Sequence, residues 1–159
     1  MPRLLIFAAC QKLIVSTEDN TLSLISIIEG FDVAFHSERE ADVLELPEHS
    51  TLPLHWYAVA CWLREDGEEG VQYELRFSVV DPKGKILKEW PQAFAMDKVQ
   101  HRVFAHFDHF PVSLMGRYLL NLSLRRLGDE EWRDVGSFPL SLTFKTDVAE
   151  ANKGDAVKK

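Results

Sequence analysis

The chain has 159 residues, of which 46% are hydrophobic, and a formal net charge of −7. This length suits one domain, and this apolar content excludes a wholly disordered chain. No apolar run approaches the ~20 residues of a membrane-spanning helix. The acidic balance, without a basic patch, argues against nucleic acid and against an anionic membrane surface as partners.

The first apolar segment, residues 4–9, follows one arginine and precedes Cys10. This order resembles the end of a bacterial lipoprotein signal, in which Cys10 would carry the lipid. The run is shorter than the roughly 7–15 residues of a signal peptide's apolar region, and a second strand-like stretch follows at once. We therefore expect a core strand here, with lipidation of Cys10 as the alternative.

Strand-like segments separated by turns continue from there to residue 144. They span residues 22–28, 31–35, 54–63, 71–80, 86–90, 99–107, 118–126 and 132–144. Residues 71–80 alternate most clearly, with apolar side chains at the odd positions, as in a strand with one buried face. Roughly nine strands without a helical period predict an all-β fold, an antiparallel two-sheet sandwich that forms one domain over residues 1–146.

One long segment interrupts the strand pattern. Residues 36–53 carry scattered acidic residues, and Ser37 with Glu40 fits a capping box. We expect a short helix near residues 37–46, or an edge strand through residues 43–46. Residues 147–159 hold no aromatic and few apolar residues, which predicts a disordered charged tail.

Gly116 and Tyr118 open the most informative strand. Behind them, Tyr118, Leu120, Leu122 and Leu124 fall on one face of a two-residue repeat. A Gly-x-Tyr sequence before such a strand is typical of the tyrosine corner of immunoglobulin-like sandwiches, where the phenol bonds to upstream backbone. We therefore expect the immunoglobulin-like form of sandwich, with Gly116 and Tyr118 as structural residues. Antibody domains differ in having a cysteine where this chain has Leu120.

The tryptophans divide into two pairs. Trp56 and Trp62 share one parity along a strand, so we expect both in the core as structural residues, as in an immunoglobulin-like sandwich. Trp90 and Trp132 lie at the ends of segments, where they could pack at the rim or form an exposed platform for sugar stacking. Both interpretations stay open for this second pair.

Cys10 and Cys61 both sit in apolar strand patterns. Two cysteines cannot build the disulfide framework of a small secreted fold. Neither has an obvious basic neighbour that would lower a thiol pKa. We expect buried, reduced thiols in a cytoplasmic protein.

His106 and Asp108 are the candidate metal ligands. Residues two apart on a strand share a face, so a His-x-Asp pair can place two ligands on one ion. A catalytic zinc ion needs a third protein ligand, and His36, His49 or His55 could supply it only through the fold. His101 and His109 lie about 26 Å apart on an extended strand, too far to share an ion. The competing interpretation is a set of polar residues at a strand end.

The acidic turns at residues 65–70 and 129–131 are a second candidate cation site, for calcium. They equally suit charged hairpin tips that keep sheet edges soluble. The chain contains no Gly-x-Ser-x-Gly elbow and no Gly-x-Gly-x-x-Gly phosphate loop. We therefore expect no enzyme and no cofactor, with an unrecognised hydrolase as the weakest alternative.

Several segments together carry a family resemblance. They are residues 7–14, residues 23–30, the turn at residues 79–84, and residues 110–112 before Gly116 and Tyr118. In these the chain resembles a family of small bacterial proteins of unknown function, over residues 4–144. The resemblance implies a compact β-rich cytoplasmic protein, and it supplies no catalytic residues to carry over to this chain.

The sequence thus favours a non-enzymatic cytoplasmic module for protein interaction or structure, one that binds an unknown protein partner or assembles as a homo-oligomer. The alternative is a protein that binds a small ligand or a metal ion through loop residues near His106 and Asp108.

Overall fold

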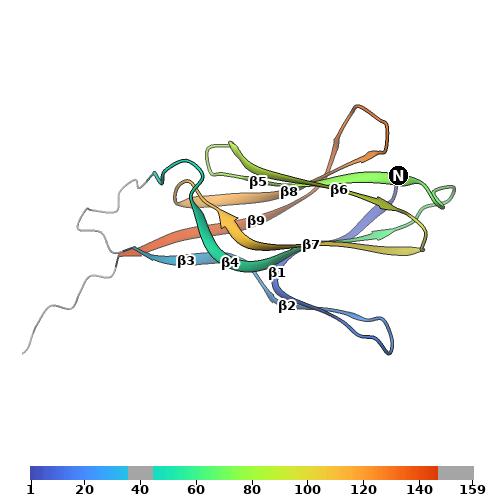
Figure 1. Cartoon of the computed structure of the whole chain (residues 1–159), viewed down its shortest axis with the longest axis horizontal. Coiled ribbons are helices and arrows are strands. Elements are labelled where there is room, and N and C mark those ends of the chain that lie inside the picture. Colours follow the sequence, from blue (N-terminus) through green and yellow to red (C-terminus); the bar gives the residue numbers. More distant parts are fainter. Residues whose placement is uncertain (36–44, 147–159) are drawn as a thin grey trace, which may run out of the picture.

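The computed structural model describes residues 1–35 and 45–146, which form nine strands in two sheets and no helix. The strands are β1 (Arg3–Val15), β2 (Leu22–Ile27), β3 (Gly30–Phe35), β4 (Thr51–Leu63), β5 (Gln72–Val80), β6 (Ile86–Ala95), β7 (Gln100–Pro111), β8 (Gly116–Arg126) and β9 (Arg133–Thr146). The first sheet has the order β2-β1-β4-β7, and the second has the order β3-β9-β8-β5-β6. The two sheets pack face to face (Figure 1), which confirms the predicted all-β sandwich.

One strand pair departs from the antiparallel prediction. β3 runs parallel to β9, while the other pairs in the two sheets are antiparallel. The cause is the connection after β2, which crosses from the first sheet to the second instead of turning back as a hairpin. Gly30 begins β3 against β9, and a Cβ at this position would lie 2.5 Å from the carbonyl oxygen of Ser141. Only glycine fits that close approach of two backbones.

The core fills the space between the sheets. Trp56 and Trp62 of β4 are fully buried, and alternate residues of β5 and β8 face them. The buried apolar positions of these two strands are Tyr73, Leu75, Phe77, Val79, Tyr118, Leu120, Leu122 and Leu124. The buried faces of β5 and β8 are those that the two-residue repeat predicts.

Tyr118 fastens the end of the sandwich where β7 turns into β8. Its hydroxyl donates a hydrogen bond to the Leu114 carbonyl at 2.7 Å. It also accepts bonds from the backbone N–H groups of Ser113 at 2.9 Å and Leu114 at 3.1 Å. This is the upstream tie that defines a tyrosine corner. Gly116 has a φ of 132°, and a Cβ there would lie 2.9 Å from Pro82, so the corner requires glycine.

The same corner holds the turn between β5 and β6. The buried Asp81 carboxylate accepts bonds from the backbone N–H groups of Lys83 and Lys85 at 2.9 and 2.8 Å. Its second oxygen accepts a bond from the Ser113 hydroxyl at 2.9 Å. The turn and the corner therefore form one network, and this network sets where β6 and β7 lie relative to each other.

Two predicted segments fall largely outside residues 1–35 and 45–146. The predicted helix near residues 37–46 lies almost wholly outside the described residues, and Glu45 and Leu46, which are described, are in neither a helix nor a strand. The tail at residues 147–159 also lies outside them. Within the described residues there is no helix long and apolar enough to cross a membrane.

Replacing Tyr118 with phenylalanine should lower the free energy of unfolding by about 1–2 kcal/mol, because three backbone groups lose a hydrogen-bond partner at a half-buried site. Urea unfolding measures the change. Tyr57→Phe is the control, since the Tyr57 hydroxyl makes no hydrogen bond to the described residues, and it should change stability by less than about 0.5 kcal/mol. Equal effects of the two substitutions would contradict the role given to the corner.

Candidate functional sites

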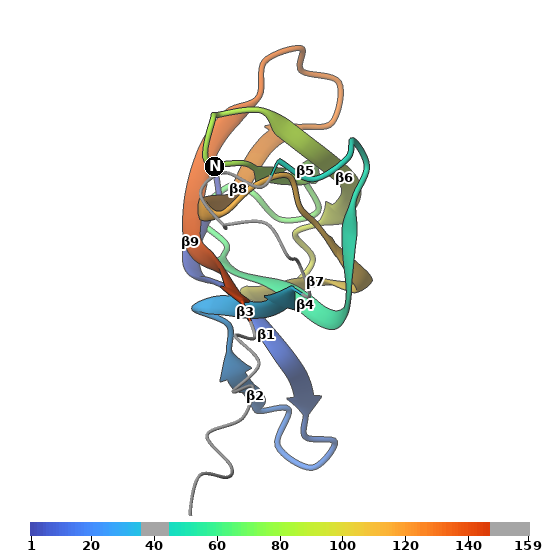
Figure 2. The ribbon, with the colours of Figure 1, turned by 90° about the vertical axis from the view of Figure 1, so that its left-hand side faces the viewer.

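The β1–β2 hairpin projects from the sandwich. β1 pairs with β4 as far as Cys10 and with β2 from Cys10 onward, so the strand changes partner in the middle. Figures 1 and 2 both place the hairpin on the side of β4 away from β5 and β8. It therefore lies outside the main core, on the outer face of the first sheet.

The inner face of the hairpin is anchored to the sheet. Leu13, Leu22 and Leu24 pack on a small second cluster of Cys10, Val59 and Cys61, separate from the main core. At the tip, the Arg102 guanidinium donates a hydrogen bond to the Asn20 carbonyl at 2.7 Å. Both cysteines are free and buried, and burial raises the pKa of each thiol. The hairpin is therefore a fixed element of the fold.

Four apolar side chains of the hairpin are exposed. We call Ile14, Val15, Ile25 and Ile27 the hairpin surface; these side chains are 38–53% exposed. β2 is the outermost strand of its sheet and pairs only with β1 among the described strands. In the part of the chain that the structure describes, one edge of β2 thus leaves backbone N–H and C=O groups without a neighbouring strand.

A second site lies on the outer face of β4 and β7. Pro53 pairs with His109 and Trp56 pairs with Phe107, so two residues of β4 oppose one residue of β7. This β-bulge places His55 opposite Asp108.

The resulting cluster has short distances. The His55 Nδ1 atom lies 2.9 Å from the Asp108 Oδ1 atom, and the His106 Nε2 atom lies 3.8 Å from the same oxygen. The three ligand atoms all lie within 4.8 Å of one another, and this is the one group of three or more potential metal ligands among the described residues. The fold thus brings the predicted pair, His106 and Asp108, together with His55.

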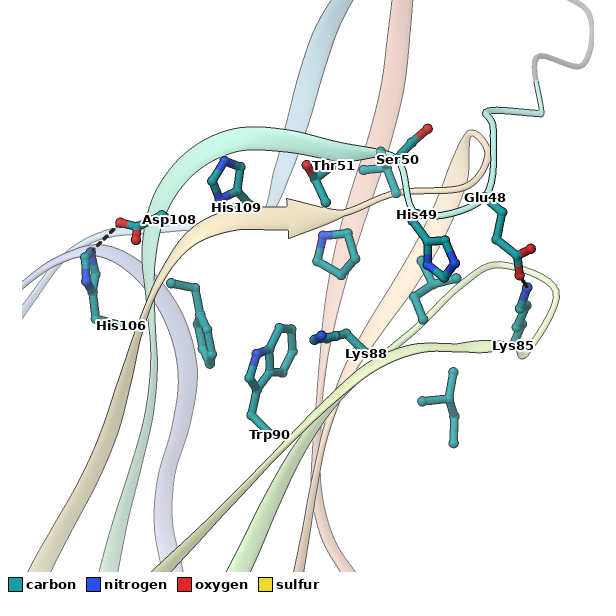
Figure 3. Close-up of a pocket in the computed structure, with 15 residues that line it drawn as sticks. Glu48, His49, Ser50, Thr51, Lys85, Lys88, Trp90, His106, Asp108 and His109 are labelled. Atoms are coloured by element: carbon teal, nitrogen blue, oxygen red, sulfur yellow. Dashed lines mark hydrogen bonds and ion pairs between the residues drawn. The ribbon is translucent and has the colours of Figure 1, made fainter.

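A groove of about 710 Å³ opens beside this cluster, between the edges of β6 and β7. Figure 3 shows Trp90 and Lys88 on the β6 side, and His106, Asp108 and His109 on β7. The Trp90 ring packs 4.4 Å from the Phe107 ring and forms part of the apolar lining of the groove. At one end, Lys85 pairs with Glu48 at 2.9 Å.

The other histidines of the described part of the chain lie outside the cluster. His49 and His109 line the groove but do not join the cluster, and His36 lies outside the described residues. His101 stacks on Phe94 at 5.0 Å, and burial lowers its pKa. His101 therefore packs as part of the sandwich.

The acidic turns and the second tryptophan pair also have structural surroundings. Glu68 of the turn at residues 65–70 is buried and accepts a hydrogen bond from the Tyr73 hydroxyl at 2.8 Å. One carboxylate of this turn, that of Glu68, is therefore buried and hydrogen-bonded within the fold. The guanidinium groups of Arg76 and Arg125 lie 4.5 and 4.4 Å from the centre of the Trp132 ring. Trp132 therefore packs against arginine side chains of β5 and β8.

Sequence reasoning could name His55 only as one of three options. Its parity, opposite to that of the buried Trp56, indicated an outward side chain. The pairing of β4 with β7 and the bulge were needed to place it beside Asp108. The hairpin surface was missed, because alternation within a strand does not show that a hairpin leaves the sandwich.

Comparisons with known proteins add little to this description. No protein-family model and no curated protein matches the chain. Among solved structures it is similar to the CARDB domain of the PF1109 protein from Pyrococcus furiosus, determined in complex with di-metal ions. The two chains are 14% identical, with 91% of this chain and 96% of that chain covered and a TM-score of 0.37. A similarity this distant carries no argument about either site.

Replacing Leu24 with alanine should loosen the hairpin on the sheet and expose the thiols beneath it. Leu24 is half-buried, so we expect a loss of about 1–2 kcal/mol of local stability and a rate of thiol modification about tenfold higher. Reaction of the native protein with a disulfide reagent measures the rate. Ile25→Ala on the exposed face is the control and should leave it unchanged. Unchanged modification in Leu24→Ala would show that the hairpin does not cover the cysteines.

Proposed function

We propose that this chain is a non-enzymatic cytoplasmic protein-interaction module whose partner binds at the hairpin surface. One observation carries the proposal: the hairpin is anchored to the sheet through Leu13, Leu22 and Leu24, yet four of its β-branched side chains are exposed. Clustered exposed apolar side chains mark interaction sites in soluble proteins. An anchored hairpin also loses little conformational entropy when a partner binds.

The unpaired edge of β2 supports a specific mode of binding. Residues 22–27 read Leu-Ser-Leu-Ile-Ser-Ile and contain no charged residue and no proline. Charged residues and proline are the usual means of preventing edge strands from pairing with other chains. An extended segment of a partner could therefore add to β2 through backbone hydrogen bonds while its side chains cover Ile25 and Ile27. The partner is a protein, either another chain or a second copy of this one.

The free cysteines support the proposed compartment. Cys10 and Cys61 are reduced and buried together in one small cluster. Unpaired thiols persist in a reducing compartment such as the cytoplasm, whereas secreted domains of this size often use disulfides.

Ile27→Lys tests the interaction surface, with Ile86→Lys as a matched control because both isoleucines are 53% exposed. Complex formation is measured by light scattering for self-association and by capture from a lysate of the source cells for another partner. Burying a lysine charge in place of an isoleucine should weaken the complex at least about tenfold in Ile27→Lys. The Ile86→Lys protein should keep the affinity of the wild type.

Two results would contradict the proposal. One is a wild-type chain that stays monomeric at high concentration and captures no partner. The other is a complex that both substitutions weaken equally, since that would place the interface away from the hairpin or make it dependent on net charge alone.

A further inference from the structure

We infer that His55, His106 and Asp108 bind one divalent transition-metal ion, with Zn²⁺ the best match to the ligands. Two imidazole nitrogens and one carboxylate oxygen are a donor set that suits zinc and disfavours calcium, which takes oxygen ligands. The site lies on β4 and β7, so it is an activity additional to the interaction proposed for the hairpin surface.

The distances fit an ion that the three side chains could share. Ligand atoms around a tetrahedral zinc ion lie roughly 3.3–3.5 Å apart, given zinc–ligand bonds of about 2.0–2.1 Å. The separations of 2.9 Å between His55 and Asp108 and of 3.8 Å between His106 and Asp108 bracket that range. No pair of ligand atoms is more than 4.8 Å apart. Small rotations of exposed side chains are enough to reach zinc geometry.

Ring contacts orient the two histidines before an ion arrives. The rings of His55 and His106 stack at 5.9 Å with an interplanar angle of 11°. The ring of His106 also packs against the ring of Tyr57, with 4.7 Å between the ring centres, and Tyr57 in turn packs on the second apolar cluster. The β4 bulge fixes the register of His55. Preorganised ligands of this kind bind metal with a smaller loss of side-chain entropy.

The charges also favour a cation. Among the described residues, the hydrogen-bond and ion-pair partners of the Asp108 carboxylate are His55 and His106, and no lysine or arginine pairs with it. An exposed histidine–carboxylate pair contributes little to stability. The stability of the fold therefore does not depend on the cluster, and the Asp108 carboxylate is available to a metal ion.

Three protein ligands leave a fourth coordination position. His106 and Asp108 also line the groove between β6 and β7, so a water molecule or a ligand in the groove can complete the coordination. Three protein ligands with one open position is the arrangement of zinc sites that bind exchangeable ligands.

Calorimetric titration with Zn²⁺ tests the site. The whole chain, without a histidine tag and stripped with a chelator, is titrated at a pH above the ordinary pKa of imidazole, because the ligands must be deprotonated. We expect one ion per chain, and affinity at least about tenfold lower in His55→Ala, His106→Ala and Asp108→Asn. The visible spectrum of the Co²⁺-substituted protein gives a second readout of bound metal and its geometry.

His109→Ala is the matched control, since His109 is an exposed neighbour on β7 that lies outside the cluster. It should keep wild-type affinity, and thermal melting confirms that each variant folds. The inference is overturned if the wild type binds no ion stoichiometrically, if the three ligand variants bind as well as the wild type, or if His109→Ala weakens binding as much as they do. None of these results depends on the hairpin, so they leave the proposed interaction untouched.

Discussion

The hydroxyl of Tyr118 is the constraint on which the groove between β6 and β7, and the histidine cluster beside it, depend. It ties the start of strand β8 back to Ser113 and Leu114, in the connection just after β7 ends at Pro111. Through Ser113 it also holds the Asp81 turn that leads into β6. The corner thus fixes two edge strands that belong to different sheets. The groove between them, and the outward side chains of β7 beside it, depend on that fixed geometry.

The two faces of the sandwich are used unequally. The outer face of the second sheet carries polar pairs such as Arg125 with Glu74 at 2.6 Å, the arrangement of a solvated surface. The outer face of the first sheet carries the features that solvation does not explain, namely the anchored hairpin and the cluster of His55, His106 and Asp108. Function is therefore expected on the first sheet, while the second acts mainly as its support.

The sequence predicts the parts of this structure that depend on local periodicity. The alternation in β5 and β8, the burial of Trp56 and Trp62 and the corner at Tyr118 all follow from side-chain parity or a short motif. β6 and β7 run further than their patterns suggest. Pro91 is tolerated within β6 because this strand lies at a sheet edge, where one side needs no N–H donor.

Features that depend on the pairing of distant segments could not be predicted. The parallel pairing of β3 with β9 follows from a crossover between sheets, and His55 reaches Asp108 only through the bulge opposite β7.

A spectrum that correlates backbone ¹H and ¹⁵N shifts, recorded through a zinc titration, tests most directly whether the first sheet carries the site. We expect shift changes confined to the neighbourhoods of His55, His106 and Asp108, with the signals of β8 and β9 unmoved. Changes centred on the acidic turn at residues 65–70 or on the cysteines, or no changes at all, would contradict it.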